Sequence, residues 1–171
     1  MQLPHPLARL ADCCWLPRHI AKARLFFRGE MPFSYRIAFG ARSGVDGYFF
    51  RHFGLGKAQV FAAIRARTDD AAVAEWFLQQ PGVTPERIAE WNRFAPLLGT
   101  KGHPGYLTRQ IVKWLLYPKS LSQPVGSLFA SIAQGASDGL VDDFVFGDGV
   151  GGNLLVGLPE RKFTFDEALE A

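Results

Sequence analysis

Proline and glycine residues divide the first 118 residues into short segments. Because these residues interrupt helices, any helices in this region must be short. The segment "TPERIAEWNRFAPLLG" shows the pattern most clearly. Thr84 is a residue type that caps helices, and Pro85 suits the first helical position, where its missing N–H would have no partner. Ile88 and Trp91 then lie on one apolar stripe. Pro96 interrupts the pattern, so we expect the helix to kink or end near it.

Similar apolar stripes between these breakers predict further helices. They are expected over residues 17–28, 46–53, 57–67, 69–80, 104–117 and 125–133. Thr68 is expected to cap the helix over 69–80. Residues 1–14 are expected to be an irregular lead-in, because they hold two prolines and no clear period. Residues 33–43 fit either a loop or a short extended piece.

The composition fits a single helical domain. Apolar residues make up 48% of the 171, with 15 Phe and 4 Trp, and this aromatic area favours a packed core or an apolar pocket. We therefore predict a mainly α fold, with one compact multi-helix domain over residues 1–137. An acidic, glycine-rich extension over 138–171 follows, with short extended stretches at 141–146 and 153–156.

Charge is distributed unevenly along the chain. Residues 1–137 contain 17 Lys and Arg against 8 Asp and Glu, whereas residues 138–171 contain 2 against 8. One interpretation is that the acidic extension lies on the basic body and neutralises it. The other is that the body meets an external anion, while the extension binds a partner or a second copy of the chain.

The first predicted helix carries the strongest local signal. The segment "WLPRHIAKARLFFRG" contains Arg18, Lys22, Arg24 and Arg28 and no acidic residue. On a helix, Arg18 and Lys22 lie one turn apart on one flank of the apolar stripe, and Arg24 and Arg28 on the other. Each like-charged pair costs roughly 0.2–0.5 kcal/mol, so an opposite charge is expected nearby.

Three kinds of compensating charge remain open. Glu30, Asp46 or the acidic extension could pair with the helix internally. A carboxylate or phosphate ligand could bind there through the forked guanidinium groups. A macromolecular anion is the third. No recognised DNA- or RNA-binding motif accompanies the charge, which argues against nucleic acid. A membrane surface is not preferred either, because the apolar stripe of the helix is expected to pack within the globular chain.

Our leading functional hypothesis is a binding module for a small anionic ligand beside an aromatic pocket. The expected ligand-binding residues are Arg18, Lys22, Arg24, Asp46, His52 and Asn92. The alternative is an enzyme without a cofactor that uses the same basic face, with His52 or Asp46 transferring a proton. Asp46, flanked by glycines, fits a helix cap better than a ligand of the basic helix.

Several site classes lack support in the sequence. No His or Cys spacing fits a metal site, so no metal is expected. The segment "GDGVGG" at 147–152 matches the pattern G-x-G-x-x-G of dinucleotide-binding proteins. That pattern needs a helix, a second strand and an acidic residue after it, and the remaining 19 residues are too few for them, so no cofactor is expected. Cys13 and Cys14 are neighbours that rarely bridge, which fits reduced thiols and a cytoplasmic location. No signal peptide and no membrane-length apolar run are recognised.

Three stretches carry a resemblance to a known family. "LPRHIAKARLFFRGEMP", "GVDGYFFRHFGL" and "GVTPERIAEWN" occur in this order, and together they resemble a widespread bacterial family known only as the domain of unknown function numbered 5069. The similarity covers roughly residues 7–118, the length of one domain. It implies no activity, because none is established for that family.

Overall fold

The computed structural model describes residues 3–31, 36, 39–107, 127–130 and 132. Its elements are the strands β1 (Arg9–Leu10) and β2 (Cys13–Cys14), the helices α1 (Leu16–Phe27), α3 (Val45–Phe53), α4 (Lys57–Ala66), α5 (Asp70–Leu78) and α6 (Pro85–Phe94), and the 3₁₀ helix η1 (Ala95–Leu97). The prediction of a mainly α fold is therefore confirmed. The predicted extension over 138–171, with its extended stretches, lies outside the described residues.

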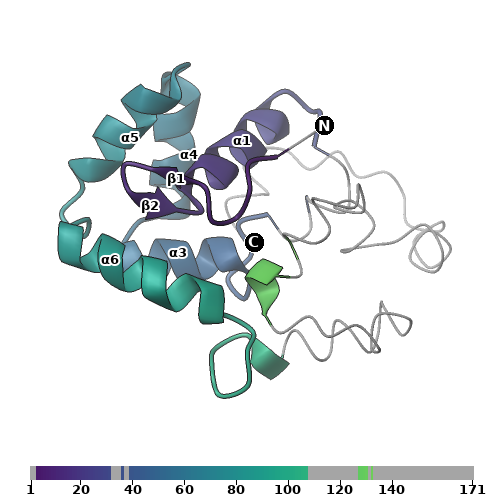
Figure 1. The fold of residues 1–171 in the computed structure, drawn as a ribbon. Coiled ribbons are helices and arrows are strands. Elements are labelled where there is room, and N and C mark those ends of the chain that lie inside the picture. Colours follow the sequence, from purple (N-terminus) through teal and green to yellow (C-terminus); the bar gives the residue numbers. More distant parts are fainter. Residues whose placement is uncertain (1–2, 32–35, 37–38, 108–126, 131, 133–171) are drawn as a thin grey trace, which may run out of the picture.

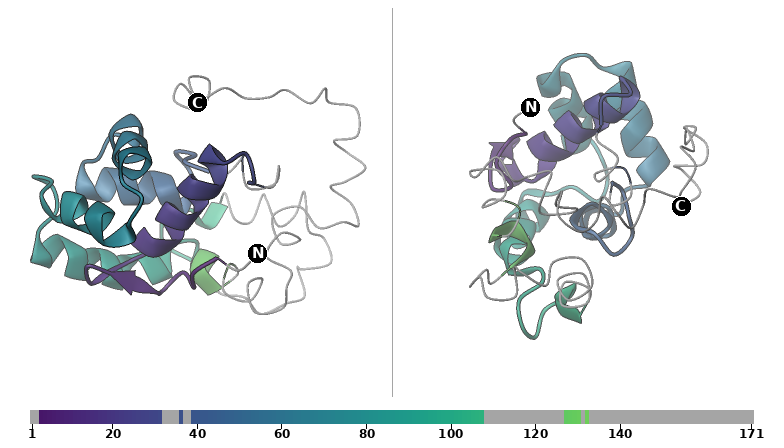
Figure 2. Two further views of the ribbon diagram at one scale, coloured as in Figure 1. Left: turned by 90° about the horizontal axis from the view of Figure 1, so that it is seen from above. Right: turned by 90° about the vertical axis from the view of Figure 1, so that its right-hand side faces the viewer.

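The helices form two groups that pack on each other (Figure 1). The helices α3 and α6 contact one another and lie in the lower half of that view, while α1, α4 and α5 lie above them. The side view in Figure 2 again places α1 and α4 in the upper part and α6 in the lower part. The strands β1 and β2 contact α1 and α6 respectively, so this hairpin joins the two groups.

Aromatic side chains fill the space between the groups. Phe49, Phe53 and Trp91 are fully buried, and Phe49 meets Trp91 at a ring-centre distance of 5.3 Å in an edge-on arrangement. Phe77 of α5 stacks on Phe49 at 5.8 Å. Such edge-on and stacked pairs add roughly 0.5–1.5 kcal/mol each to the free energy gained from burial. The expected packed aromatic core is present in this part of the chain.

The helix ends follow the sequence signals in most places. Thr84 accepts a hydrogen bond from the backbone N–H of Arg87, and α6 gives way to η1 at Ala95, one residue before Pro96. The prediction that Thr68 caps the following helix is wrong. Asp69 takes that position, where its carboxylate accepts from the Ala71 N–H. Both residue types are good caps, and only the geometry separates them.

Residues 9–14 form a hairpin, so the expectation of an irregular lead-in is wrong there. Arg9 pairs with Cys14 and Leu10 with Cys13. The two connecting residues, Ala11 and Asp12, have φ values of 51° and 58°. A two-residue turn of this kind is ordinarily signalled by Asn-Gly or Asp-Gly, and the sequence here offers neither.

The helix expected over 104–117 falls mostly outside the described residues, and the one expected over 125–133 is described at residues 127–130 and 132. Residues 106–107, 128–130 and 132 are helical. The backbone N–H of Leu128 donates to the carbonyl of Leu98, and Phe129 is buried against Trp15 at a ring-centre distance of 5.2 Å. A segment late in the chain therefore completes the core beside the start of α1.

The turn over residues 39–44 sits directly on the first turn of α3, and glycine makes this possible. A Cβ added to Gly47 would lie 2.4 Å from the carbonyl oxygen of Arg42 and 2.6 Å from that of Ala41. Both contacts are with backbone atoms, which cannot move aside without shifting the turn. Only glycine therefore fits at this position.

Gly47→Ala is expected to lower the free energy of unfolding by about 1–3 kcal/mol, the range for overpacking a filled interior. Chemical denaturation followed by circular dichroism measures the change. Gly56→Ala is the matched control, because a Cβ at Gly56 would meet nothing closer than 3.8 Å. Equal stability of the two variants would contradict the close contact at Gly47.

Candidate functional site

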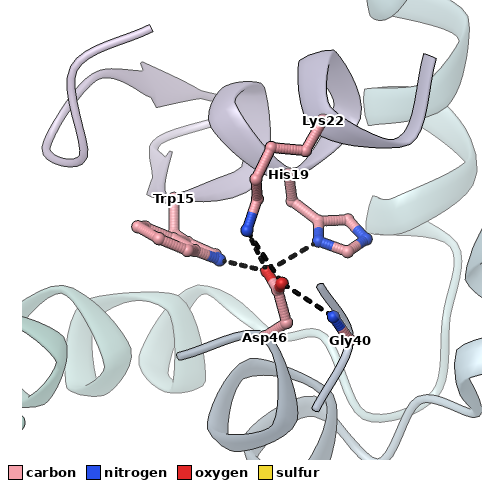
Figure 3. Close-up of polar contacts among 5 residues, drawn as sticks. All are labelled: Trp15, His19, Lys22, Gly40 and Asp46. Atoms are coloured by element: carbon pink, nitrogen blue, oxygen red, sulfur yellow. Dashed lines mark hydrogen bonds and ion pairs between the residues drawn. The ribbon is translucent and has the colours of Figure 1, made fainter. Parts of the chain in front are cut away.

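A single carboxylate, that of Asp46 in α3, gathers polar groups from three parts of the chain (Figure 3). Oδ1 accepts hydrogen bonds from Trp15 Nε1 and His19 Nδ1, each at 2.8 Å. Lys22 Nζ donates to Oδ1 at 3.0 Å and to Oδ2 at 2.8 Å, and the Gly40 N–H donates to Oδ2 at 3.0 Å. We call these five residues the Asp46 cluster.

The local sequence explains why these groups meet. Trp15, His19 and Lys22 are spaced four and three residues apart, so they project from one side of α1. Figure 3 shows all three side chains descending from α1 towards α3. Gly40, which has φ 69°, turns its backbone N–H towards the same carboxylate. The cluster thus joins α1, α3 and the 39–44 turn.

The cluster is buried and charged. Asp46 is 2% exposed and Lys22 7%. Burial by itself would raise the pKa of the Asp46 carboxyl, but Lys22 and His19 outweigh burial and hold that pKa well below its usual range. Burial also lowers the pKa of the Lys22 ammonium, and Asp46 opposes this. Asp46 is therefore ionised at neutral pH and is too weak a base to take up a proton there.

Asp46 does not cap its helix, so that interpretation of the sequence was wrong. The helix α3 begins at Val45 with Gly44 as N-cap, and no side chain caps it. Asp46 already lies inside the first turn, and its carboxylate turns towards α1. Asp46 instead pairs with the basic helix, through Lys22 and His19 of α1, as the alternative interpretation held.

Lys57, at the start of α4, lies beside the cluster. Its side chain crosses Gly40, where an added Cβ would be 2.8 Å from Lys57 Cε, and its Nζ lies 5.9 Å from the centre of the Phe61 ring. Burial lowers the pKa of Lys57, and the Asp46 carboxylate partly opposes this. Across the described part of the chain, no carboxylate is within ion-pair distance of Lys57.

Trp15 is held in a strained conformation at the N-cap of α1. Its φ of 72° lies in the left-handed region, which bulky side chains rarely adopt. Other side chains contact the Trp15 ring. Lys22 Nζ lies 4.6 Å from the centre of the ring, and Phe129 packs against the ring. Strain of this kind costs of order 1–3 kcal/mol and persists where the surroundings fix it, which happens most often at functional sites.

The residues predicted as ligands fall into two sets. Arg18, Lys22 and Asp46 lie at or beside the cluster, and Arg18 is 1% exposed with its Nη1 donating to the carbonyl of Pro4 at 2.7 Å. Arg24 lies elsewhere: it pairs with Asp70 at 2.7 Å and also donates to the carbonyl of Arg67.

His52 and Asn92 also lie apart from the cluster, in structural contacts. His52 Nε2 is 2.8 Å from the carbonyl oxygen of Arg87, which links α3 to α6. Asn92 accepts from the Cys14 N–H at 2.9 Å and donates to the carbonyl of Asp12 at 2.7 Å, so it holds the hairpin against α6. Both side chains thus connect elements of the fold.

Sequence reasoning missed Trp15, His19 and Lys57 as members of the site. The first two share a helical face with Lys22, and this spacing is a usable signal once a buried acid is expected opposite that face. Lys57 carries no such signal, because its place beside Gly40 depends on packing between segments that are distant in the sequence.

The neighbouring cysteines show no sign of reactivity. Both are free and buried. Burial raises the pKa of the Cys14 thiol to about 11 and moves that of Cys13 further in the same direction. Thiols of this kind are protonated at neutral pH and are poor nucleophiles.

The fold and the cluster together define a small, mainly helical domain. In it, α1 and α3 are joined through the buried carboxylate of Asp46. The sequence profile of the family described as "Domain of unknown function (DUF5069)" matches residues 2–112, more than half of the chain. The chain belongs to this family. No curated protein sequence matches it significantly.

Two further findings concern the described residues only. None of their helices is both long and apolar enough to cross a membrane. Within the same residues, no three His, Cys, Asp or Glu side chains are grouped so that they could hold a metal ion.

Asp46→Asn is expected to lower the free energy of unfolding by about 3–5 kcal/mol, because it leaves the buried Lys22 ammonium without its counter-charge. Adding Lys22→Met to Asp46→Asn should recover part of the loss, since the double variant buries no unpaired charge. Urea denaturation of the single and double variants gives the coupling energy.

Glu30→Gln serves as the control for this cycle. It breaks the exposed pair between Arg28 and Glu30, which is 2.8 Å long, and such surface pairs contribute less than about 1 kcal/mol. If Asp46→Asn cost no more than Glu30→Gln, the Asp46 cluster would not be the main link between α1 and α3.

Proposed function

We propose that this domain binds a small anionic ligand, a carboxylate or a phosphate, next to the Asp46 cluster, with Lys57 as its principal charged contact. The observation that supports the proposal most is the environment of Lys57. Its ammonium is partly removed from water, and the described residues provide no carboxylate to pair with it. An ionised group in this position gains free energy from an anion.

The charge balance around the cluster favours the same conclusion. Two ammonium groups, those of Lys22 and Lys57, share the field of one carboxylate, that of Asp46. Among these three groups, one positive charge is left over. The local potential is therefore positive, which attracts anions and concentrates them at the site.

Aromatic rings beside the ammonium groups would strengthen such binding. Phe39 and Phe61 stack at a ring-centre distance of 5.1 Å, with Lys22 Nζ 5.4 Å from the first ring and Lys57 Nζ 5.9 Å from the second. An apolar wall keeps water away, and the attraction between opposite charges grows as the local dielectric constant falls.

This proposal narrows the set of residues that the sequence suggested. Lys22 remains as a source of positive potential, Asp46 orients Lys22, and Arg18 lies beside the cluster. Arg24, His52 and Asn92 are assigned to structural contacts instead. The alternative of partner binding or self-assembly through residues 138–171 stays a prediction, because that segment lies outside the described residues.

Phosphate, acetate and glycolate are expected to raise the melting temperature above that in chloride at equal ionic strength. A ligand at 100 times its Kd adds about 2.7 kcal/mol to the stability of a protein with one site. Lys57→Gln should weaken binding by about tenfold, since a charge-assisted contact contributes roughly 1.5–3 kcal/mol. Differential scanning fluorimetry and isothermal titration calorimetry measure these effects.

The matched control is Arg28→Gln, which removes an exposed cation from the basic segment that contains α1. Its anion response should equal that of the unmodified protein. A flat response to every anion tested, or an equal loss in the Lys57 and Arg28 variants, would refute the proposal.

Binding should also depend on pH in a defined direction. The pKa of Lys57 is lowered in the free protein, and an adjacent anion raises it again. Binding therefore takes up a proton between the two pKa values, and affinity falls as pH rises through that interval. Calorimetry in two buffers with different ionisation enthalpies detects the uptake, and Lys57→Gln should abolish it.

A further inference from the structure

Gly40 belongs to the Asp46 cluster and also contacts Lys57. Its backbone N–H donates to Asp46 Oδ2 at 3.0 Å, and Figure 3 shows the Gly40 nitrogen facing the carboxylate. The stem of Lys57 crosses the same residue: a Cβ added to Gly40 would lie 2.8 Å from Lys57 Cε and 3.3 Å from its Cδ and Nζ. One residue therefore touches both the buried carboxylate and the cation of the proposed anion site.

Two features fix the backbone of Gly40. Its φ of 69° lies in the left-handed region, which glycine adopts without strain. Its N–H is held by an ionised carboxylate that is itself anchored in α3 and 2% exposed. Gly40 is also buried. Its Cα is therefore a fixed point against which a neighbouring side chain can rest.

The side chain that rests there is the stem of Lys57. A lysine stem in solvent samples many rotamers, and ordering them when a ligand binds lowers the affinity. In this structure the stem is ordered beforehand, because it occupies the space that a side chain at Gly40 would fill. The ammonium group then lies 5.9 Å from the centre of the Phe61 ring.

We propose that Gly40 is a positioning residue of the anion site. Its backbone, held by Asp46, and its missing side chain together place the Lys57 ammonium beside Phe61 with the stem already ordered. The inference rests on the proposed anion binding and adds the residue that orders the principal charged contact. It also connects the anion site to the ion pair between α1 and α3, since both depend on the same stretch of backbone.

Gly40→Ala tests this role. The close contact that it creates falls on the flexible end of a side chain and not on backbone, so Lys57 can turn away and the variant should fold. Binding of inorganic phosphate to the full chain should weaken about threefold to tenfold, the range for ordering one long side chain on binding. Isothermal titration calorimetry measures the affinity.

Gly54→Ala is the matched control. Gly54 has a φ of 64°, so alanine meets similar backbone strain there, but an added Cβ has nothing within 4 Å in the described part of the chain. The phosphate affinity of this variant should equal that of the unmodified protein. An equal loss of affinity in the two variants would overturn the inference, because backbone strain alone would then explain it.

The Lys57→Gln background shows whether Gly40 acts through Lys57. In that background, Gly40→Ala should cause no further loss of phosphate affinity, because the group that it displaces is already absent. A defect unrelated to Lys57 would lower the affinity by the same factor in both backgrounds. That result would overturn the positioning role.

NMR tests the contact in the unmodified protein. The Gly40 Hα protons should give nuclear Overhauser cross-peaks to the ε-methylene protons of Lys57, and their absence would overturn the inference. Gly40→Ala should move these methylene resonances towards those of lysines in solvent. If Gly40→Ala does not fold, Gly40→Asn replaces it, because asparagine tolerates the left-handed backbone better.

The outcomes separate this inference from the proposed function. Phosphate binding of equal strength in the unmodified protein and in Gly40→Ala would overturn the positioning role and leave anion binding intact. If phosphate, acetate and glycolate all failed to bind the unmodified protein, both would be overturned.

Discussion

One ionised carboxylate, buried among aromatic side chains, holds the two halves of the described domain together. Asp46 accepts five hydrogen bonds, from the N-cap residue of α1, from two further positions on α1 and from the 39–44 turn. Removing a carboxylate from water costs several kcal/mol, and Lys22 with these donors offsets that cost. The position of α1 relative to α3 therefore depends on electrostatics as much as on apolar packing.

The same arrangement links stability to the proposed chemistry. The rings that exclude water from the cluster, among them Phe39 and Phe61, also surround the free nitrogen of His19 and flank Lys57. A low local dielectric constant strengthens the ion pair at Asp46, and it makes unpaired polar groups beside that pair more costly. The packing that strengthens the Asp46 ion pair therefore also makes the unpaired His19 Nε2 more costly.

Within the described residues, the sequence predicted the helices well because each depends on local signals. Thr84, Pro85 and Pro96 set the limits of α6 through contacts within one or two turns. The site was less predictable, because it depends on contacts across long separations. Pairing of Asp46 with the basic helix was one alternative, but the local pattern favoured a cap, and that preference was wrong. Nothing in the sequence near Lys57 indicates that its side chain lies against Gly40.

The hairpin shows a different limit. Ala11 and Asp12 adopt left-handed backbone angles without the glycine that usually marks them, and Asn92, some 80 residues later, fastens the hairpin through two hydrogen bonds. Conformations maintained by distant residues leave no trace in the local sequence. The same holds for the strained N-cap at Trp15.

Phe129 has a consequence for where this domain ends. The profile of the family stops at residue 112, yet the ring that covers Trp15 comes from a segment beyond that limit. A protein cut at residue 112 would lose this ring and uncover one side of Trp15, next to the only buried acid among the described residues. The folded unit therefore extends beyond the segment that the family profile matches.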